Sequence, residues 1–397
     1  MGRTGASAQF IVLVALLNAM VAMSIDTMLP AIGAIASELG ASDPNSRQFI
    51  ITSFFAGMTI GTLIYGPWSD SIGRKPAIYA GLVLYAVGAL LCLFATSFPV
   101  MLIGRFVQGF GAASPRIVSI AMVRDGSAGA AMAKVMSFVM TVFMLVPILA
   151  PSIGQLVLVI ASWRMIFAGF LVIGVIAGVW LWLGQPETLP RERRSTLSPR
   201  NLLVASGEVF RTPITVGYTL AVGCIFGSFI CYLGTSQQIF AEQYAQAEYF
   251  ALWFGFFAVA IAIAMLLNAK LVMTFGMRSL SKWALRASIA LSAMFLAVGL
   301  AAQGHPPLWT LGCYLFANFF CAGILFGNYN AIALEPMGRI AGMAAAISGS
   351  LSSLVAIVSG SIVGQFYDGT VIPLAMGFTI LGLCAFLLTE WAERYRP

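Results

Sequence analysis

Three ionisable side chains stand inside long apolar runs of the sequence: Asp26, Arg105 and Arg116. A charge in hydrocarbon costs about 2.5 to 3.5 kcal/mol on insertion scales, so a residue of this kind needs a partner or a water-filled cavity. At about 1.5 Å per residue, Asp26 lies roughly 15 Å and Arg105 about 8 Å from the nearer end of its run. We expect the two to meet, which would give a carboxyl whose protonation responds to access from either side of a membrane.

The spacing of Arg105 and Arg116 places them on one helix face. Eleven residues at about 100° each return to within roughly 20° of the starting direction, and Gln108 and Ala112 lie close to the same line. A face with two guanidiniums and a carboxamide should line a cavity, and the candidate substrate-binding residues there are Arg116, Gln108 and the acid Asp26. The alternatives are a structural ion pair for Asp26 and contact with lipid headgroups for Arg116.

The elements that must position these residues are membrane-spanning helices. The chain is 60% hydrophobic and 9% charged, with a mean hydropathy of +0.94, far from the usage of soluble proteins. Apolar runs of about 20 residues can cross the bilayer as helices. The sequence predicts an all-α integral membrane protein with twelve such runs, at 9–36, 48–67, 76–97, 100–122, 133–159, 163–184, 213–238, 249–270, 282–303, 307–332, 340–366 and 371–390.

Basic residues concentrate in alternate connections, with only Arg47 and Arg164 near the opposite face. By the positive-inside rule, both termini and the segment 185–212 should be cytoplasmic. The net charge of +7 then reflects topology and anionic lipid headgroups, so no nucleic-acid partner is expected. The six cysteines lie in apolar runs without metal-ligand spacing, and neither a metal nor a cofactor is expected.

The segment 185–212, rich in Arg, Pro and Ser, divides the chain into two halves. We predict an N-terminal six-helix lobe at 1–184 that holds the proton-coupling residues, a cytoplasmic linker at 185–212 and a C-terminal six-helix lobe at 213–397. A weak internal similarity supports a duplication of the six-helix half: Gly276-Met277-Arg278 resembles Gly73-Arg74-Lys75.

Several motifs of the N-terminal half have a joint likeness to one family. They are Asp26-Thr27-Met28-Leu29-Pro30, the segment from Gly66 to Pro76, the run from Arg105 to Ser114, Val123-Arg124-Asp125, Trp163-Arg164 with Phe167, and Pro186-Glu187-Thr188. With these motifs the chain resembles drug:proton antiporters of the major facilitator superfamily, and most of all their bicyclomycin and chloramphenicol resistance branch. The resemblance implies the major facilitator fold and proton-coupled export by alternating access, with Asp26 and Arg105 as the coupling residues.

The same resemblance implies a set of gating residues. The segment from Gly66 to Lys75 is expected to be a loop between two spans, in which Asp70 and Arg74 form a latch with Asp125. Ser71 and Trp68 depart from the family pattern in this loop, and the fifth span keeps only part of the antiporter motif. The gating residues implied are Gly66, Asp70, Gly73, Arg74, Lys75, Asp125, Pro151 and Gly154.

In the C-terminal half, the polar candidates for substrate contact are Tyr218, Tyr232, Asn328 and Asn330. One cavity acid and two arginines suit neutral or zwitterionic lipophilic compounds such as amphenicols. The sequence therefore predicts a monomeric, proton-coupled exporter of lipophilic drugs in the bacterial inner membrane, in contact with lipids. The rivals are an exporter or proton-coupled carrier of a small metabolite, such as a sugar or nucleoside, and a sensor that does not transport. With a single histidine and no nucleophile beside a base, the sequence does not predict an enzyme.

Overall fold

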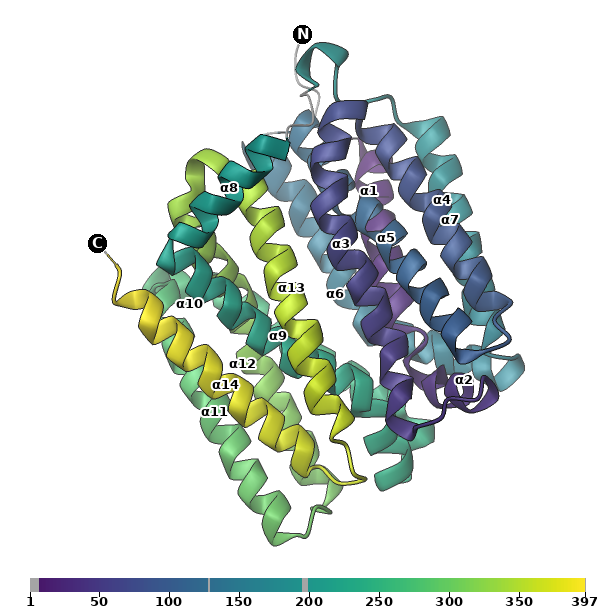
Figure 1. Ribbon diagram of the computed structural model, residues 1–397, viewed down its shortest axis with the longest axis vertical. Helices are drawn as coiled ribbons and strands as arrows, with labels where there is room; N and C mark the ends of the chain where they lie inside the picture. Colours follow the sequence, from purple (N-terminus) through teal and green to yellow (C-terminus); the bar gives the residue numbers. More distant parts are fainter. Residues whose placement is uncertain (1–6, 128, 195–198, 397) are drawn as a thin grey trace. The chain divides into compact units, whose positions relative to one another are not determined.

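The structure is a computed structural model that describes residues 7–127, 129–194 and 199–396 (Figure 1). These residues form helices and connections, with no strand among them. The α-helices are, in chain order, α1 Ala8–Asp26, α2 Ile32–Glu38, α3 Phe49–Ile72, α4 Arg74–Leu93, α5 Phe98–Gly126, α6 Gly129–Ile160, α7 Arg164–Gly184, α8 Pro199–Arg211, α9 Pro213–Gln238, α10 Phe250–Phe275, α11 Met277–Ala301, α12 Leu308–Leu334, α13 Ala341–Gln365 and α14 Ile372–Glu393.

Short helical turns extend or join several of these helices. A 3₁₀ turn at Leu29–Ala31 joins α1 to α2, so that one apolar helical segment runs from Ala8 to Glu38. Others lie at Pro44–Gln48, Arg191–Arg193, Ala247–Tyr249 and Glu335–Ile340, with a π-helical turn at Ile239–Gln243. Within the described ranges, twelve helical segments are long and apolar enough to cross a bilayer. The prediction of an all-helical chain with twelve spans is confirmed.

The chain separates into two compact units, Met1–Ser198 and Pro199–Pro397. In the first unit, α5 packs along both α3 and α4, while α1 packs against α6, α5 and α7 (Figure 1). Helix α5 carries Arg105 and α1 carries Asp26. This unit therefore brings the helices with the two predicted coupling residues into direct contact.

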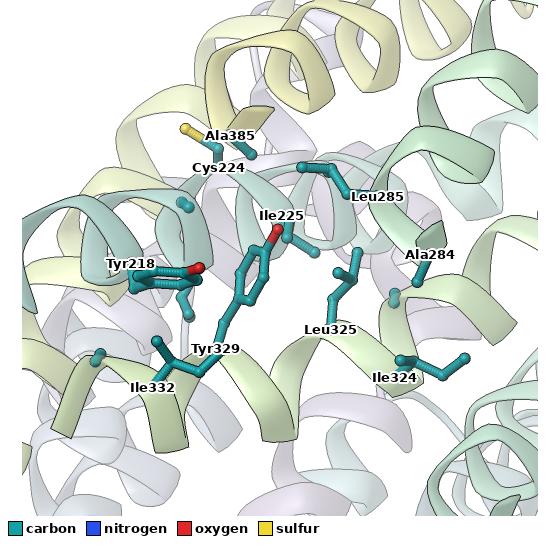
Figure 2. Packing of buried hydrophobic residues seen from close by; sticks show 14 of the residues in the cluster. Tyr218, Cys224, Ile225, Ala284, Leu285, Ile324, Leu325, Tyr329, Ile332 and Ala385 are labelled. Atoms are coloured by element: carbon teal, nitrogen blue, oxygen red, sulfur yellow. The ribbon is translucent and has the colours of Figure 1, made fainter. Parts of the chain in front are cut away.

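The second unit is built around α9, which packs against α12, α13 and α14. Its core joins Tyr218, Leu285, Leu325 and Tyr329 from three different helices, as Figure 2 shows. Helix α8 adds a smaller cluster to this unit, in which its Ala205 and Val209 pack with Met337, Ala344 and Ile347.

The predicted domain boundaries, at 1–184, 185–212 and 213–397, stay a prediction. What the structure adds is the local packing of the segment expected to be a linker. Lys75 Nζ donates to the carbonyl oxygen of Gln185, which ties this stretch to the first unit. Residues 199–211 are helical and pack on α13 and α9 in the second unit. Much of the expected linker is thus ordered on one unit or the other.

The segment from Gly66 to Lys75 is not the loop that we expected. Helix α3 continues to Ile72 with Pro67 inside it, and α4 begins at Arg74, so Gly73 alone separates the two helices. Gly73 has φ 111° and ψ 160°, a conformation that side chains other than glycine rarely adopt. A Cβ there would also lie 2.7 Å from Oε2 of Glu187. The chain therefore turns between α3 and α4 on a single glycine.

Candidate functional site

The carboxyl of Asp26 is buried at the C-terminal end of α1, with 6% of the residue exposed. Among residues 7–127, 129–194 and 199–396, none forms a hydrogen bond or ion pair with this carboxyl. The backbone leaves the α-helix here and passes through Thr27 into the 3₁₀ turn at Leu29–Ala31. An acid that is buried without a fixed counter-ion is uncommon and costly, which marks it as a functional candidate.

The expected ion pair between Asp26 and Arg105 does not form. Arg105 has no exposed surface, and its guanidinium donates to three oxygen atoms: to Ile50 O at 3.3 Å from Nε, to Gln108 Oε1 at 2.6 Å from Nη1, and to Ser24 O at 3.0 Å from Nη2. Its Cζ also lies 4.4 Å from the ring centroid of Phe54. Uncharged acceptors and an aromatic face thus satisfy this cation without a carboxylate. Its contact with α1 is the carbonyl of Ser24, two residues before Asp26.

Neutral side chains extend the contacts of Arg105 to α4. The Ser24 hydroxyl donates to Met20 O and lies 2.6 Å from the Tyr85 hydroxyl, and both residues are fully buried. Gln108, whose oxygen binds Arg105, has a buried Nε2 without a hydrogen-bond partner among the described residues. Sequence reasoning missed Ser24 and Tyr85 because a neutral residue in an apolar run carries no charge signal. The hydrogen bonds of Arg105 thus link α5 to α1 and α3, and Ser24 links α1 to α4.

Two predicted gating residues lie on α6, which packs against the chain just after Asp26. Pro151 is inside α6, and Gly154 faces α1 so closely that a Cβ at this position would lie 1.8 Å from Thr27 O. Only a glycine permits this approach of two backbones. The main chain beside Asp26 is therefore held at Ser24 by Arg105 and at Thr27 by Gly154.

At the junction of α3 and α4, Arg74 lies among acidic residues of two helices. Its Nη1 donates to Asp70 on α3 and to Ser69 Oγ, and its Nε lies 2.8 Å from Asp125 Oδ2 on α5. The structure thus brings together three of the residues implied as a latch, whose gating role stays a prediction. Gly66 lies within α3, where a Cβ would have no atom within 4 Å.

Glu187 completes this junction in a way that the sequence did not suggest. Its two carboxylate oxygens accept the backbone N–H groups of Arg74 at 3.0 Å and of Lys75 at 3.1 Å. These are the first N–H groups of α4, which lack partners inside the helix and attract negative charge. Glu187 therefore caps α4 from a segment more than a hundred residues away in the chain.

Arg116 lies on α5 with its Nη1 3.5 Å from Sδ of Met58 on α3. One turn further along α5, Ser119 Oγ donates to Arg116 O at 3.3 Å and accepts from Asn18 Nδ2 at 3.1 Å. Among the residues that the structure describes, no carboxylate pairs with Arg116. The guanidinium is thus placed in the first unit with a thioether as its polar neighbour.

In the second unit, Tyr218 belongs to a charged cluster. Its hydroxyl donates to Glu393 Oε1 at 2.7 Å, and Arg278 Nε donates to the same oxygen at 3.0 Å while its Nη2 binds Glu335 at 2.6 Å. The ring of Tyr218 packs edge-on against that of Tyr329 at 5.1 Å between centroids (Figure 2). Tyr218 therefore has a structural partner here, in addition to the role in substrate contact that we predicted for it.

The other candidates of this unit are scattered. Tyr232 is buried, and its ring packs against those of Phe254, Phe257 and Phe319. Asn328 exchanges two hydrogen bonds with Asn268, at 2.9 and 3.0 Å. Asn330 is exposed and donates to Phe326 O. The structure does not gather them into one cluster.

The sequence reading also missed a polar cluster inside the second unit. Asn318 Nδ2 donates to Ser292 Oγ at 2.8 Å, and Ser288 Oγ donates to Asn318 Oδ1 at 3.2 Å. Ser292 Oγ in turn lies 3.2 Å from the Tyr314 hydroxyl. Because its members are neutral and spread over α11 and α12, no sequence pattern groups them.

Twelve apolar helical segments, a first unit with charged groups in its interior and charged clusters at the helix ends define the class of a polytopic membrane carrier. Residues 13–360 match the sequence profile described as Major Facilitator Superfamily. The chain belongs to this superfamily and is a multi-pass membrane transporter.

Two relatives illustrate the similarity in sequence. A bicyclomycin resistance protein homolog from Haemophilus influenzae is 30% identical over 383 residues, which cover 95% of this chain and 94% of the relative. The multidrug resistance protein MdtL from Klebsiella pneumoniae is 28% identical over 331 residues, or 82% of this chain and 80% of the relative.

Among solved structures, the xylose transporter XylE from E. coli, in a partially occluded inward-open conformation, has a TM-score of 0.73. The likeness covers 98% of this chain and 97% of that one, at 15% sequence identity. At this identity the comparison establishes the fold alone, which is the major facilitator fold.

Proposed function

We propose that this protein exports lipophilic drugs from the cell in exchange for protons. The observation that carries the proposal is the Asp26 carboxyl, which is buried in α1 without a partner among the described residues. Two relatives named for bicyclomycin and multidrug resistance, similar over 95% and 82% of the chain, support drugs as the cargo. Amphenicol-like compounds remain the first class to test.

Asp26 is the proton carrier in this proposal, and Arg105 is a positioning residue. Since no cation among the described residues pairs with Asp26, its carboxyl can accept a proton on one side of the membrane and release it on the other. The contacts at Ser24 and Thr27 tie its backbone to α5 and α6. A change in charge at Asp26 can therefore alter the packing of α1 against both helices.

Opening and closing of the carrier is assigned to the charged junction of α3, α4 and α5. The pair of Arg74 with Asp70 is partly exposed, with 48% of the Asp70 side chain accessible, whereas the pair with Asp125 is largely buried. An exposed ion pair such as that of Arg74 with Asp70 is weak enough to break and re-form during a transport cycle. Gly66 in α3, Gly73 and Lys75 at the start of α4, and Pro151 with Gly154 in α6 complete the set of proposed gating residues.

The proposal places the carrier in the bacterial inner membrane as a monomer in contact with lipid, with both termini in the cytoplasm. It keeps residues 1–184 as the proton-coupling lobe and 213–397 as the lobe that contributes mostly apolar and aromatic surface. The candidate substrate contacts remain those predicted from the sequence, namely Asp26, Gln108, Arg116, Tyr218, Tyr232, Asn328 and Asn330.

The test is dissipation of a preset proton gradient in proteoliposomes when a drug is added, with wild type compared to Asp26→Asn. We expect amphenicols or other lipophilic drugs to collapse the gradient only in the wild type. The matched control is Glu38→Gln. Glu38 is an acid at the end of the same helical segment as Asp26; its side chain is about half exposed and pairs with Arg164. This control should retain coupling. Drug-driven proton flux through Asp26→Asn at the wild-type rate would contradict the proposal.

The same assay separates the rival cargo. Sugars and nucleosides are added to the panel, because a carrier of small polar metabolites should respond to them and not to bulky lipophilic drugs. A response to a sugar alone would leave the membership of the superfamily intact and overturn drug export.

A further inference from the structure

Arg116 differs from the other arginines that the structure pairs. Arg74 and Arg278 each bind two carboxylates, Arg164 binds Glu38, and Arg105 donates to three oxygen atoms. Across the described residues, the side chain of Arg116 makes a single polar contact, with the thioether of Met58. Sulfur of this kind is a weak acceptor. The charge of Arg116 therefore lacks the partner that its counterparts have.

The direction of the Arg116 side chain indicates that its guanidinium does not extend to the headgroups at the nearer, C-terminal end of α5. Long side chains of a helix point back toward its N-terminus. Gly57, next to Met58, packs against Phe106 O and Phe110 N of α5. Met58 thus lies beside α5 at about the level of Phe110, roughly 9 Å before Arg116 along the axis. The guanidinium extends toward the middle of the span, which argues against the headgroup alternative.

The polar side chains that lie near Arg116 in the fold do not neutralise its charge. Ser119 and Asn18 bond to one another, and the Met58 side chain is buried. A cation inside a membrane-spanning unit is costly, and it persists where it serves a ligand or a conducted ion. A guanidinium offers two parallel donors that match the two oxygens of a carboxylate, and a neighbouring thioether packs well on an aromatic ring.

We propose that Arg116 binds a carboxylate of the exported compound, so that the substrates include lipophilic drugs with an acidic group. This inference rests on the proposed drug export and adds the chemical class of the cargo. Met58 provides an apolar contact beside the carboxylate.

The test compares two ligands that differ only in the acid: norfloxacin, a fluorescent aromatic carboxylate, and its methyl ester. Binding to the purified full-length protein in nanodiscs is followed by equilibrium dialysis for wild type, Arg116→Gln, Arg116→Lys and the control Arg164→Gln. Loss of a charge-assisted hydrogen bond should weaken norfloxacin about 10- to 100-fold in Arg116→Gln. The ester should bind all four proteins alike, which also shows that the variants are folded. Arg116→Lys should retain part of the preference for norfloxacin over its ester.

Equal weakening of acid and ester in Arg116→Gln, or no weakening of either, overturns the inference and leaves drug export standing. If the wild type binds neither ligand and no lipophilic drug dissipates the proton gradient, the proposed function fails and the carboxylate site fails with it.

Discussion

At the scale of single residues, Arg105 is the clearest case of a charge held by geometry. A lysine keeps the charge but places one nitrogen where the guanidinium has three, so it cannot serve Ser24 O, Ile50 O and Gln108 together. We expect Arg105→Lys to lower the free energy of unfolding by about 3 kcal/mol, since each hydrogen bond to a charged group contributes about 1.5 to 3 kcal/mol.

Thermal unfolding in detergent measures this loss, and Arg164→Lys is the matched control. Arg164 is partly exposed and pairs with Glu38, so its replacement should change stability by less than about 1 kcal/mol. If Arg105→Lys unfolded at the wild-type temperature, the three donors would not be needed to hold the helices.

The sequence could identify the charged residues of the first unit but not their partners. Asp26, Arg105 and Arg116 stand out because ionisable residues are rare in apolar runs. The acceptors of Arg105 are two backbone carbonyls and a neutral side chain, and any position of the chain offers such groups. The estimated depths of Asp26 and Arg105 therefore suggested an ion pair between them, whereas in the structure Arg105 donates to Ser24 O.

At the scale of helices, the contact of α6 with α1 depends on one glycine. In Gly154→Ala, the new Cβ would lie 1.8 Å from Thr27 O, and the obstacle is backbone that cannot rotate away. Overpacking of this kind costs about 1 to 3 kcal/mol. We expect reduced thermal stability and loss of transport, because the displaced helix is the one that carries Asp26.

Gly169→Ala in α7 is the matched control, since a Cβ there would have no atom within 4 Å. In a helical position with open space around the new Cβ, the same substitution is neutral or stabilising by up to about 1 kcal/mol. Equal effects of the two alanines on the unfolding temperature would show that the close contact with α1 is not what Gly154 provides.

The helices themselves were largely predictable, and their ends were not. Composition and run length suffice for twelve spans, because only long apolar helices can cross hydrocarbon. They do not show that α3 continues through Pro67 to Ile72, since that depends on the turn at Gly73 and on the cap that Glu187 provides.

At the scale of the whole molecule, both units contain the same arrangement of a glycine and an arginine at the start of a helix. Gly73 before α4 and Gly276 before α11 both have positive φ, and the arginine that follows each binds acids from other helices. The similarity at Gly276-Met277-Arg278 was faint in sequence because the acids that complete the second cluster, Glu335 and Glu393, lie far along the chain.

This second cluster can be measured with a double-mutant cycle on Arg278→Gln and Glu393→Gln. Because the pair is partly buried, we expect a coupling of about 0.5 to 3 kcal/mol in the free energy of unfolding. The unfolding temperatures of the two single variants and the double variant give this value. Additive effects would mean that Arg278 and Glu393 do not stabilise the second unit through their contact.

If each of the twelve candidate spans in the described ranges crosses the membrane once, an even number of crossings places both ends of that part of the chain on one side. We proposed that this side is the cytoplasm, because the positive-inside rule predicts that arginine-rich connections lie there. A fluorescent protein fused after residue 397 should therefore fluoresce, and alkaline phosphatase inserted after His305 should be active. The reverse result would move Arg74, Asp125 and Arg278 to the outer face together. The proposed gate would then open toward the opposite compartment, whereas the drug would still leave the cell, because in an exchanger the proton gradient and not the orientation of the protein sets the direction of cargo movement.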